Sequence, residues 1–215
     1  MPTVDQILEK YVAALGGEAA LQKTYNQIAK GTATDAEGRK FPFEVFYKIP
    51  TKRVFVIQRT NALNIMYSYD GDTGWMLGED GPPHIMKSNE LDPSKLEDPF
   101  YFAGRMKQVF SDLRVDGTEK VDNHDAYVLA GRTGVLPLVK LYFDKDSGLL
   151  VRLVSQTETA LGRLPVQVDY ADYRTSDGVK IPFRWTTTQS RGRLFTTYQF
   201  DDVRHPVPNF SEFPE

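Results

Sequence analysis

Apolar residues near the start of the chain recur at the spacing of an α-helix. One helix face would carry Val4, Ile7, Leu8, Tyr11, Val12 and Leu15, and Gly16-Gly17 would end the run. Thr3 and Gln6 have the spacing of a capping box. The pattern therefore predicts an amphipathic helix over residues 4–15. The stretch EAALQKTY (18–25) indicates a second short helical turn.

From about Asn26 apolar and polar residues alternate, which is the period of a β-strand. The stretch FPFEVFYKI (41–49) places on one face Phe41, Phe43, Val45, Tyr47 and Ile49. Further strands are predicted at RVFVIQRT (53–60) and IMYSYDG (65–71). After residue 113 the alternation returns in AYVLAGR, VKLYFD, LLVRLVSQT, VQVDYADY, IPFRWTTT and LFTTYQFDDV.

Short Gly- or Asp-rich segments separate most of these strands and are predicted to be turns. They include AEGR (36–39), DGTEKVDNHD (116–125), SDGV (176–179) and SRGR (190–193). Two other segments, DGDTG (70–74) and DKDSG (144–148), resemble the start of a calcium loop. Such a loop needs an oxygen ligand at position 5 and a Glu at position 12. Those positions hold Gly74 and Gly81 in one segment, and Gly148 and Ser155 in the other. Both are therefore predicted to be hairpin turns.

The segment 82–110 interrupts the strand pattern. Helical spacing joins Leu96, Phe100, Ala103, Met106 and Phe110. Asp98-Pro99 has the composition of a helix start. We therefore expect one α+β domain over residues 1–215, with an N-terminal helix, about 11 antiparallel strands and a helical insertion between two runs of strands. A sheet of that length must curl, so an incomplete barrel is predicted.

The composition excludes several classes of function. The chain has no Cys, which rules out disulfides, thiolate catalysis and Cys-based metal centres. A net charge of −3 gives no broad attraction to nucleic acid or to an anionic bilayer. No stretch approaches the roughly 20 apolar residues of a membrane span. The N-terminus lacks the regions of a signal peptide, so we expect either a cytosolic protein or a mature chain from which that peptide has been removed.

The sequence offers little evidence of catalytic chemistry. His84, His124 and His205 are far apart, and none has a second ligand at a metal-binding spacing. Nucleotide-binding loops and the G-x-S-x-G elbow are absent. Asp169 and Asp172 could meet for acid–base work, but solvated strand faces explain them more simply. We therefore expect a protein that is not an enzyme and has no cofactor or metal.

Some of the predicted strands are apolar on both faces. Val54 and Val56 point one way and Phe55 and Ile57 the other, while Phe46 lies opposite the main apolar face of its strand. A sheet with one covered face needs only one apolar face per strand. Either helices cover the second face, or these side chains line a cavity that holds an apolar ligand.

The insertion is also richer in apolar residues than one helix face requires. It contributes Phe100, Tyr101, Phe102, Met106 and Phe110. Two interpretations stay open. The insertion could plug the mouth of the curled sheet and complete its core, or it could line a ligand site.

Two stretches resemble the outer-membrane lipoprotein carrier (LolA-like) superfamily. In YDGDTGWML (69–77), Asp70, Gly71 and Trp75 match the family's D-G-x-x-x-W strand–turn–strand. LYFDKDSGLLVRL is similar to a later hairpin of the family. The family's D-Y-[RK]-x-x-D-G-[VL]-x-[FIL]-P stretch is matched by Asp172, Tyr173, Arg174, Asp177, Gly178, Val179, Ile181 and Pro182. The similarity in layout covers nearly the whole chain.

The resemblance implies an incomplete barrel closed by helices around a hydrophobic cavity, in a protein of the periplasm or cell envelope. The family's dedicated carriers use an arginine in the early strands to hold a helical lid. Arg53 and Arg59 fall in those strands here, and neither is assigned that role from the sequence.

These observations lead to one main hypothesis and one alternative. The first is a non-enzymatic binding protein that holds a lipid, a lipoprotein acyl chain or another apolar ligand. Its predicted ligand-binding residues are Trp75, Phe100, Phe102, Met106 and Trp185. The alternative is a protein-interaction or envelope-sensing module with a packed, ligand-free barrel and an exposed apolar patch.

Overall fold

The computed structural model describes residues 1–23, 26–48, 51–59, 64–78, 81–98, 102–159, 162–189 and 194–204. Its helices are α1 (Val4–Ala14), α2 (Glu18–Lys23), α3 (Ser88–Leu96) and α5 (Met106–Val109). The strands of the first run are β1 (Asn26–Asp35), β2 (Lys40–Lys48), β3 (Lys52–Ile57), β4 (Ile65–Asp70), β5 (Thr73–Leu77) and β6 (His84–Ile85). The second run comprises β7 (Ser111–Val121), β8 (His124–Arg132), β9 (Val139–Asp144), β10 (Leu150–Thr159), β11 (Gly162–Ser176), β12 (Val179–Gln189) and β13 (Leu194–Arg204).

The N-terminal helix forms where the periodicity predicts it. Thr3 is its N-cap: the Thr3 hydroxyl accepts a hydrogen bond from the backbone N–H of Gln6 (3.3 Å), and the Gln6 side chain accepts one from the Thr3 backbone N–H (2.9 Å). This reciprocal pair satisfies two N–H groups that a helix start leaves unpaired. Ile7, Leu8 and Tyr11 are buried, so α1 is anchored by one apolar face.

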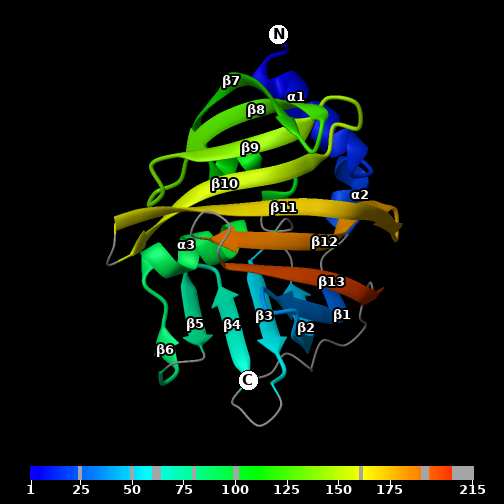
Figure 1. The fold of residues 1–215 in the computed structure, drawn as a ribbon. Coiled ribbons are helices and arrows are strands. Elements are labelled where there is room, and N and C mark those ends of the chain that lie inside the picture. The colour runs from blue at the N-terminus through cyan, green and yellow to red at the C-terminus, as the bar shows by residue number, and fades with distance from the viewer. Residues whose placement is uncertain are drawn as a thin grey trace.

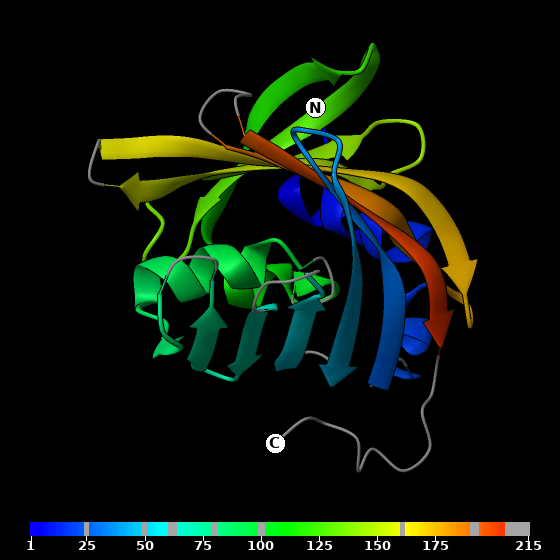
Figure 2. The same cartoon turned by 60° about the horizontal axis from the view of Figure 1, so that its bottom comes forward.

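All thirteen strands form one antiparallel sheet in the order β6-β5-β4-β3-β2-β1-β13-β12-β11-β10-β9-β8-β7. The first and last strands of the meander, β1 and β13, pair with each other, so the two runs join into one surface. The sheet bends strongly and leaves β6 and β7 as open edges (Figure 1). Viewed from its end, it curves around α1, α3 and α5 (Figure 2). The predicted incomplete barrel is confirmed.

The two strands beyond the predicted eleven lie at the two edges of the sheet. β6 has only two residues, too few to show an alternating pattern. β7 covers most of DGTEKVDNHD, so the prediction of a turn there was wrong except at Asp122-Asn123. β7 is an exposed edge strand with two register irregularities, and Asp112 and Gly117 have positive φ. Bulges and charges of this kind protect a free edge from unwanted pairing, and they also erase the apolar alternation.

The D-x-D-[ST]-G segments are turns between paired strands. Gly71, with φ of 61°, lies in the turn that joins β4 to β5. In the second segment the Asp144 carboxylate accepts a hydrogen bond from the backbone N–H of Ser147 (2.7 Å). Asp177 and Gly178 turn β11 into β12, both with positive φ. Positive φ at both turn positions suits the twist of a two-residue hairpin.

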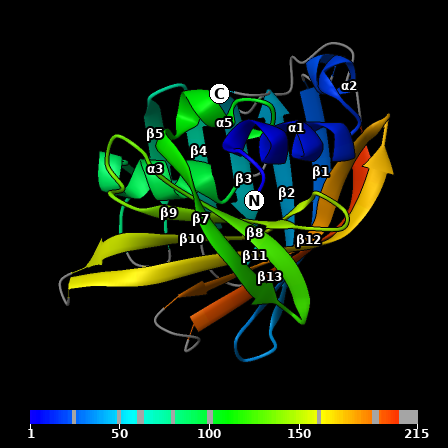
Figure 3. The same ribbon diagram turned by 90° about the horizontal axis from the view of Figure 1, so that it is seen from above.

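The helices and the insertion fill the concave side of the sheet (Figure 3). Buried core residues include Ile7, Tyr11, Phe43, Leu96, Phe102, Met106, Phe110, Leu129, Leu141, Phe143 and Leu153. The predicted helical stripe of the insertion is divided among α3, the segment 102–105 and α5, so it is not one continuous helix. The predicted helix start at Asp98-Pro99 lies partly outside the described residues. At this end of the barrel the insertion completes the core.

Candidate ligand-binding pocket

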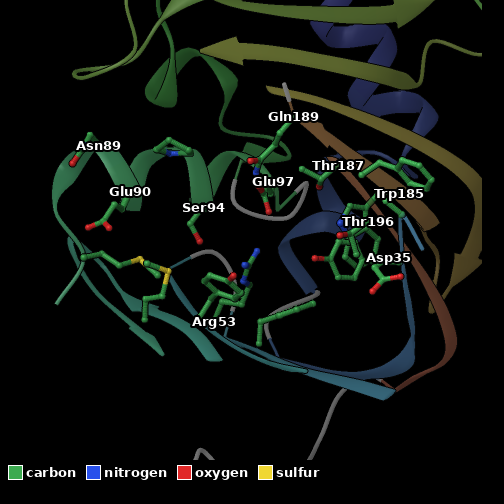
Figure 4. Close-up of a pocket in the computed structure, with 18 of the residues that line it drawn as sticks. Asp35, Arg53, Asn89, Glu90, Ser94, Glu97, Trp185, Thr187, Gln189 and Thr196 are labelled. Carbon is green, nitrogen blue, oxygen red and sulfur yellow. The ribbon is translucent and has the colours of Figure 1, made fainter. Parts of the chain in front are cut away.

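A cavity of about 570 Å³ opens between α3 and the concave face of the sheet (Figure 4). Strands β3, β4, β5, β12 and β13 form one wall and α3 forms the other. The lining consists of Asp35, Ala36, Glu37, Arg53, Phe55, Tyr67, Met76, Met86, Asn89, Glu90, Pro93, Ser94, Glu97, Trp185, Thr187, Gln189, Phe195, Thr196 and Tyr198. The volume is in the range of small-molecule sites in proteins.

Aromatic side chains form the sheet side of the pocket. Trp185 and Tyr198 face each other across β12 and β13, and their rings stack at 4.9 Å with 17° between the planes. Phe55 meets Tyr198 edge to face at 5.4 Å. Phe43 lies beneath them and touches Phe55, Trp185 and Tyr198. Rigid rings held by strand register give a preformed apolar surface.

Arg53 points into the pocket from β3 (Figure 4). Its side chain is 7% exposed, and its Nη1 lies 3.9 Å from Oδ2 of the buried Asp98. The guanidinium also lies over the rings of Phe55 and Tyr69, and the Tyr69 hydroxyl donates a hydrogen bond to Asp98 (2.8 Å). Arg53 Nε, in contrast, has no hydrogen-bond partner among the described residues. The Arg53 side chain is therefore held in place, while its Nε–H remains without a hydrogen-bond acceptor within the described ranges.

Glu97 is the C-cap of α3 and lines the opposite wall. Burial raises the pKa of its carboxyl group to about 6, and the positive charge of Arg53 partly opposes that shift. Its backbone N–H closes the end of α3, but within the described residues the Glu97 carboxylate makes no hydrogen bond or ion pair. Thr187, on β12, also lines the pocket, and its buried hydroxyl has no hydrogen-bond partner among the residues that the structure describes. Buried polar atoms are normally satisfied, so these groups indicate a site that can bind a ligand.

The rim of the pocket is acidic. Asp35 and Glu37 both pair with Arg39, at 2.6 and 3.1 Å. Glu90 accepts a hydrogen bond from the backbone N–H of Lys87, which lowers the pKa of its carboxyl group. Among the described lining residues Arg53 is the only cation, against four carboxylates.

The sequence-predicted site residues are placed in different parts of the molecule. Trp185 lines the pocket. Phe102 is fully buried in the core, and Met106 lines a second cavity of about 650 Å³ between α1 and the segment 104–108. Trp75 is 43% exposed. Its neighbour Met76 lines the pocket, so strand alternation puts Trp75 on the outer face of the sheet. Phe100 lies outside the described residues.

The same alternation explains the strands that are apolar on both faces. Arg53 and Phe55 face the pocket, so Val54 and Val56 face outward. Val54 lies opposite Phe46 across β2 and β3. The outward residues thus neither meet the helices nor line this pocket. They pair with one another on the outer face.

The sequence did not identify Arg53, Glu97 or Thr187 as site residues. Two signals pointed to Arg53: it lies on the same face as Phe55 in an otherwise apolar strand, and it falls in the early strands where the resembled carriers use an arginine. Asp169 and Asp172, considered for acid–base work, each pair with an arginine of their own, Arg152 and Arg174. In the described part of the chain no three His, Asp or Glu side chains gather as metal ligands. No helix there has the length and apolar character to cross a membrane.

Comparison with known proteins places this geometry in a recognised fold. No family model and no curated protein matches the sequence. Among solved structures the chain is similar to a DUF1329 family protein from Desulfovibrio piger, with a TM-score of 0.67 and 14% identity over 96% of this chain and 95% of that one. It is also similar to a LolA superfamily protein from Nitrosomonas europaea, with a TM-score of 0.62 and 13% identity over 97% and 96%. The chain has a LolA-like fold. A domain from Vibrio parahaemolyticus named for outer membrane lipoprotein sorting shares this LolA-like fold, with a TM-score of 0.58 and 13% identity over 93% and 90%.

Proposed function

We propose that this protein is a non-enzymatic binding protein of the cell envelope that holds an amphiphile in the pocket beneath α3. The observation that carries the proposal is a preformed cavity of about 570 Å³ with an aromatic wall and unsatisfied polar atoms inside it. Aromatic rings would bury the apolar part of the ligand, at about 0.8 kcal/mol per buried CH₂ group. The polar atoms would fix its head group.

The LolA-like fold supports an envelope location, since the solved structures that share it include a domain named for outer membrane lipoprotein sorting. The alternative of a packed, ligand-free barrel fits only part of the molecule. Phe102, Met106 and Phe110 fill the barrel beneath the second run of strands, whereas the space beneath α3 stays open. We therefore favour ligand binding over a purely protein-interacting module.

The second cavity, beside α1, is a weaker candidate. Its walls come from α1, the Gly17-Glu18 segment and residues 104–108, and none of its described lining residues belongs to the curved sheet. The pocket beneath α3 instead gathers side chains from both runs of strands around the buried Arg53–Asp98 pair. That pair connects β3 to the end of α3. We propose that it holds α3 over the ligand.

Titration with Nile red, a neutral solvatochromic dye, tests this function. Ser94 projects from α3 into the pocket, so Ser94→Trp should fill the space and weaken binding at least about tenfold. Ser88→Trp, on an exposed position of the same helix, is the matched control and should bind like the parent protein. Equal binding by both variants, or no saturable binding by the parent, would count against the proposal.

A further inference from the structure

Two charged groups enter the pocket from opposite walls without a complete set of partners. The buried Nε–H of Arg53, on β3, has no hydrogen-bond partner in the described part of the chain, and the side chain is only 7% exposed. Glu97 presents a carboxylate from the end of α3, without an ion pair among the described residues. Figure 4 shows the two side chains pointing toward the same space. The Arg53 Nε–H needs a hydrogen-bond acceptor, and the Glu97 carboxylate needs a hydrogen-bond donor.

The charges around the pocket disfavour a head group that is only anionic, only cationic or uncharged. Asp98 already neutralises Arg53. The other described lining charges are four carboxylates, and Arg39 at the rim pairs with two of them, Asp35 and Glu37, so the site keeps a net negative charge. An anionic head group would therefore meet net repulsion. A cationic head group would satisfy Glu97 but leave Arg53 Nε without an acceptor. An uncharged head group could donate a hydroxyl hydrogen bond to the Glu97 carboxylate but would not neutralise its charge, which is costly in a partly buried site.

We propose that the pocket selects amphiphiles with a zwitterionic head group, whose anionic oxygen accepts from Arg53 Nε and whose ammonium binds Glu97. This inference rests on the proposed function and names its ligand class. The unpaired Thr187 hydroxyl supplies one more hydrogen bond in the same space. The nearby faces of Trp185 and Tyr198 favour an ammonium through cation–π attraction. A phosphoethanolamine head group has the required order of charges.

Displacement of bound Nile red by single-chain lipids of one acyl length, below their micelle concentrations, tests the inference. The panel is lysophosphatidylethanolamine, lysophosphatidylglycerol, monoacylglycerol, an alkylamine, and glycerophosphoethanolamine, which has the head group without a chain. Lysophosphatidylethanolamine should displace the dye at a concentration at least about tenfold lower than any other member, as expected for two charge-assisted hydrogen bonds. Glu97→Gln should reduce its advantage over lysophosphatidylglycerol to within about threefold. Glu44→Gln, which makes the same change beside Lys30 and outside the pocket, should leave that advantage intact.

Equal potency of the zwitterionic and anionic lipids would overturn the inference, and so would a preference that survives Glu97→Gln. Displacement by glycerophosphoethanolamine at the same concentration as the lipid would show a site for small zwitterions and also overturn it. If no lipid displaces Nile red while Ser94→Trp still abolishes dye binding, the inference fails and the proposed pocket stands. If Nile red does not bind in the pocket at all, both fail.

Discussion

Glu97 gives the sharpest thermodynamic prediction, because its carboxyl group lies in the pocket wall without a partner. Burial raises its pKa from 4.5 to about 6. The folded protein therefore binds this proton more tightly than the unfolded chain does, and the resulting stability is lost as the pH rises through about 4.5 to 6. A difference of about 1.5 pKa units corresponds to about 2 kcal/mol. Above that window the ionised Glu97 costs the folded state this amount.

Glu97→Gln keeps the shape of the neutral carboxyl group and removes the charge. We expect the variant to match the parent protein at pH 4 and to exceed its free energy of unfolding by about 2 kcal/mol at pH 8. Urea unfolding followed by circular dichroism at pH 4, 6 and 8 measures the difference. Glu44→Gln serves as the control and should shift the stability by no more than about 1 kcal/mol. A gain that is independent of pH, or a loss at pH 8, would refute the reasoning.

Three further substitutions probe the framework around the pocket by the same urea assay. Asp98→Ala leaves the Arg53 charge buried without its partner and should lower the free energy of unfolding by about 3–5 kcal/mol. The control Asp70→Ala removes an exposed ion pair with a lysine of β3 and should lower it by less than about 1 kcal/mol. Similar losses for the two variants would contradict the buried pairing. Gly31→Ala would place a Cβ against the backbone carbonyl oxygen of Gln199 in β13, so a loss of about 1–3 kcal/mol is expected. A neutral effect would show that β1 and β13 are less closely paired. Thr3→Ala removes the helix cap and should cost about 1 kcal/mol, while an unchanged stability would mean that the cap is not formed in solution.

The sequence predicts most of the fold because its strands alternate and its turns carry Asp and Gly. Prediction failed where the spacing of apolar residues does not follow the secondary structure. β7 has both faces largely exposed and is bulged, so charges replace the alternation that marks a strand. β6 is too short to have a period. In the insertion, Met106 and Phe110 share helical spacing with Leu96, yet the chain breaks between them into separate elements.

The candidate site was much harder to predict than the fold. Trp75 and Trp185 are equally apolar in the sequence, and only the direction of curvature decides which one faces the pocket. The Arg53–Asp98 pair joins a strand to the end of a helix, and no local pattern connects two positions so far apart. In the sequence Glu97 resembles an ordinary solvated acid, and only the packing of α3 over the sheet places it in the pocket wall. Sites assembled from distant segments depend on tertiary packing, which periodicity does not encode.

The central claim, that the pocket beneath α3 binds an amphiphile, can be tested with the protein's own fluorescence. The chain has two tryptophans: Trp185 lines the pocket and Trp75 lies on the outer face of the sheet. Trp75→Phe and Trp185→Phe each leave one reporter. Titration with a lysolipid that carries a nitroxide on its acyl chain should quench the fluorescence of Trp185 saturably and leave the fluorescence of Trp75 unchanged. Equal quenching of both tryptophans, or quenching of Trp75 alone, would contradict the account.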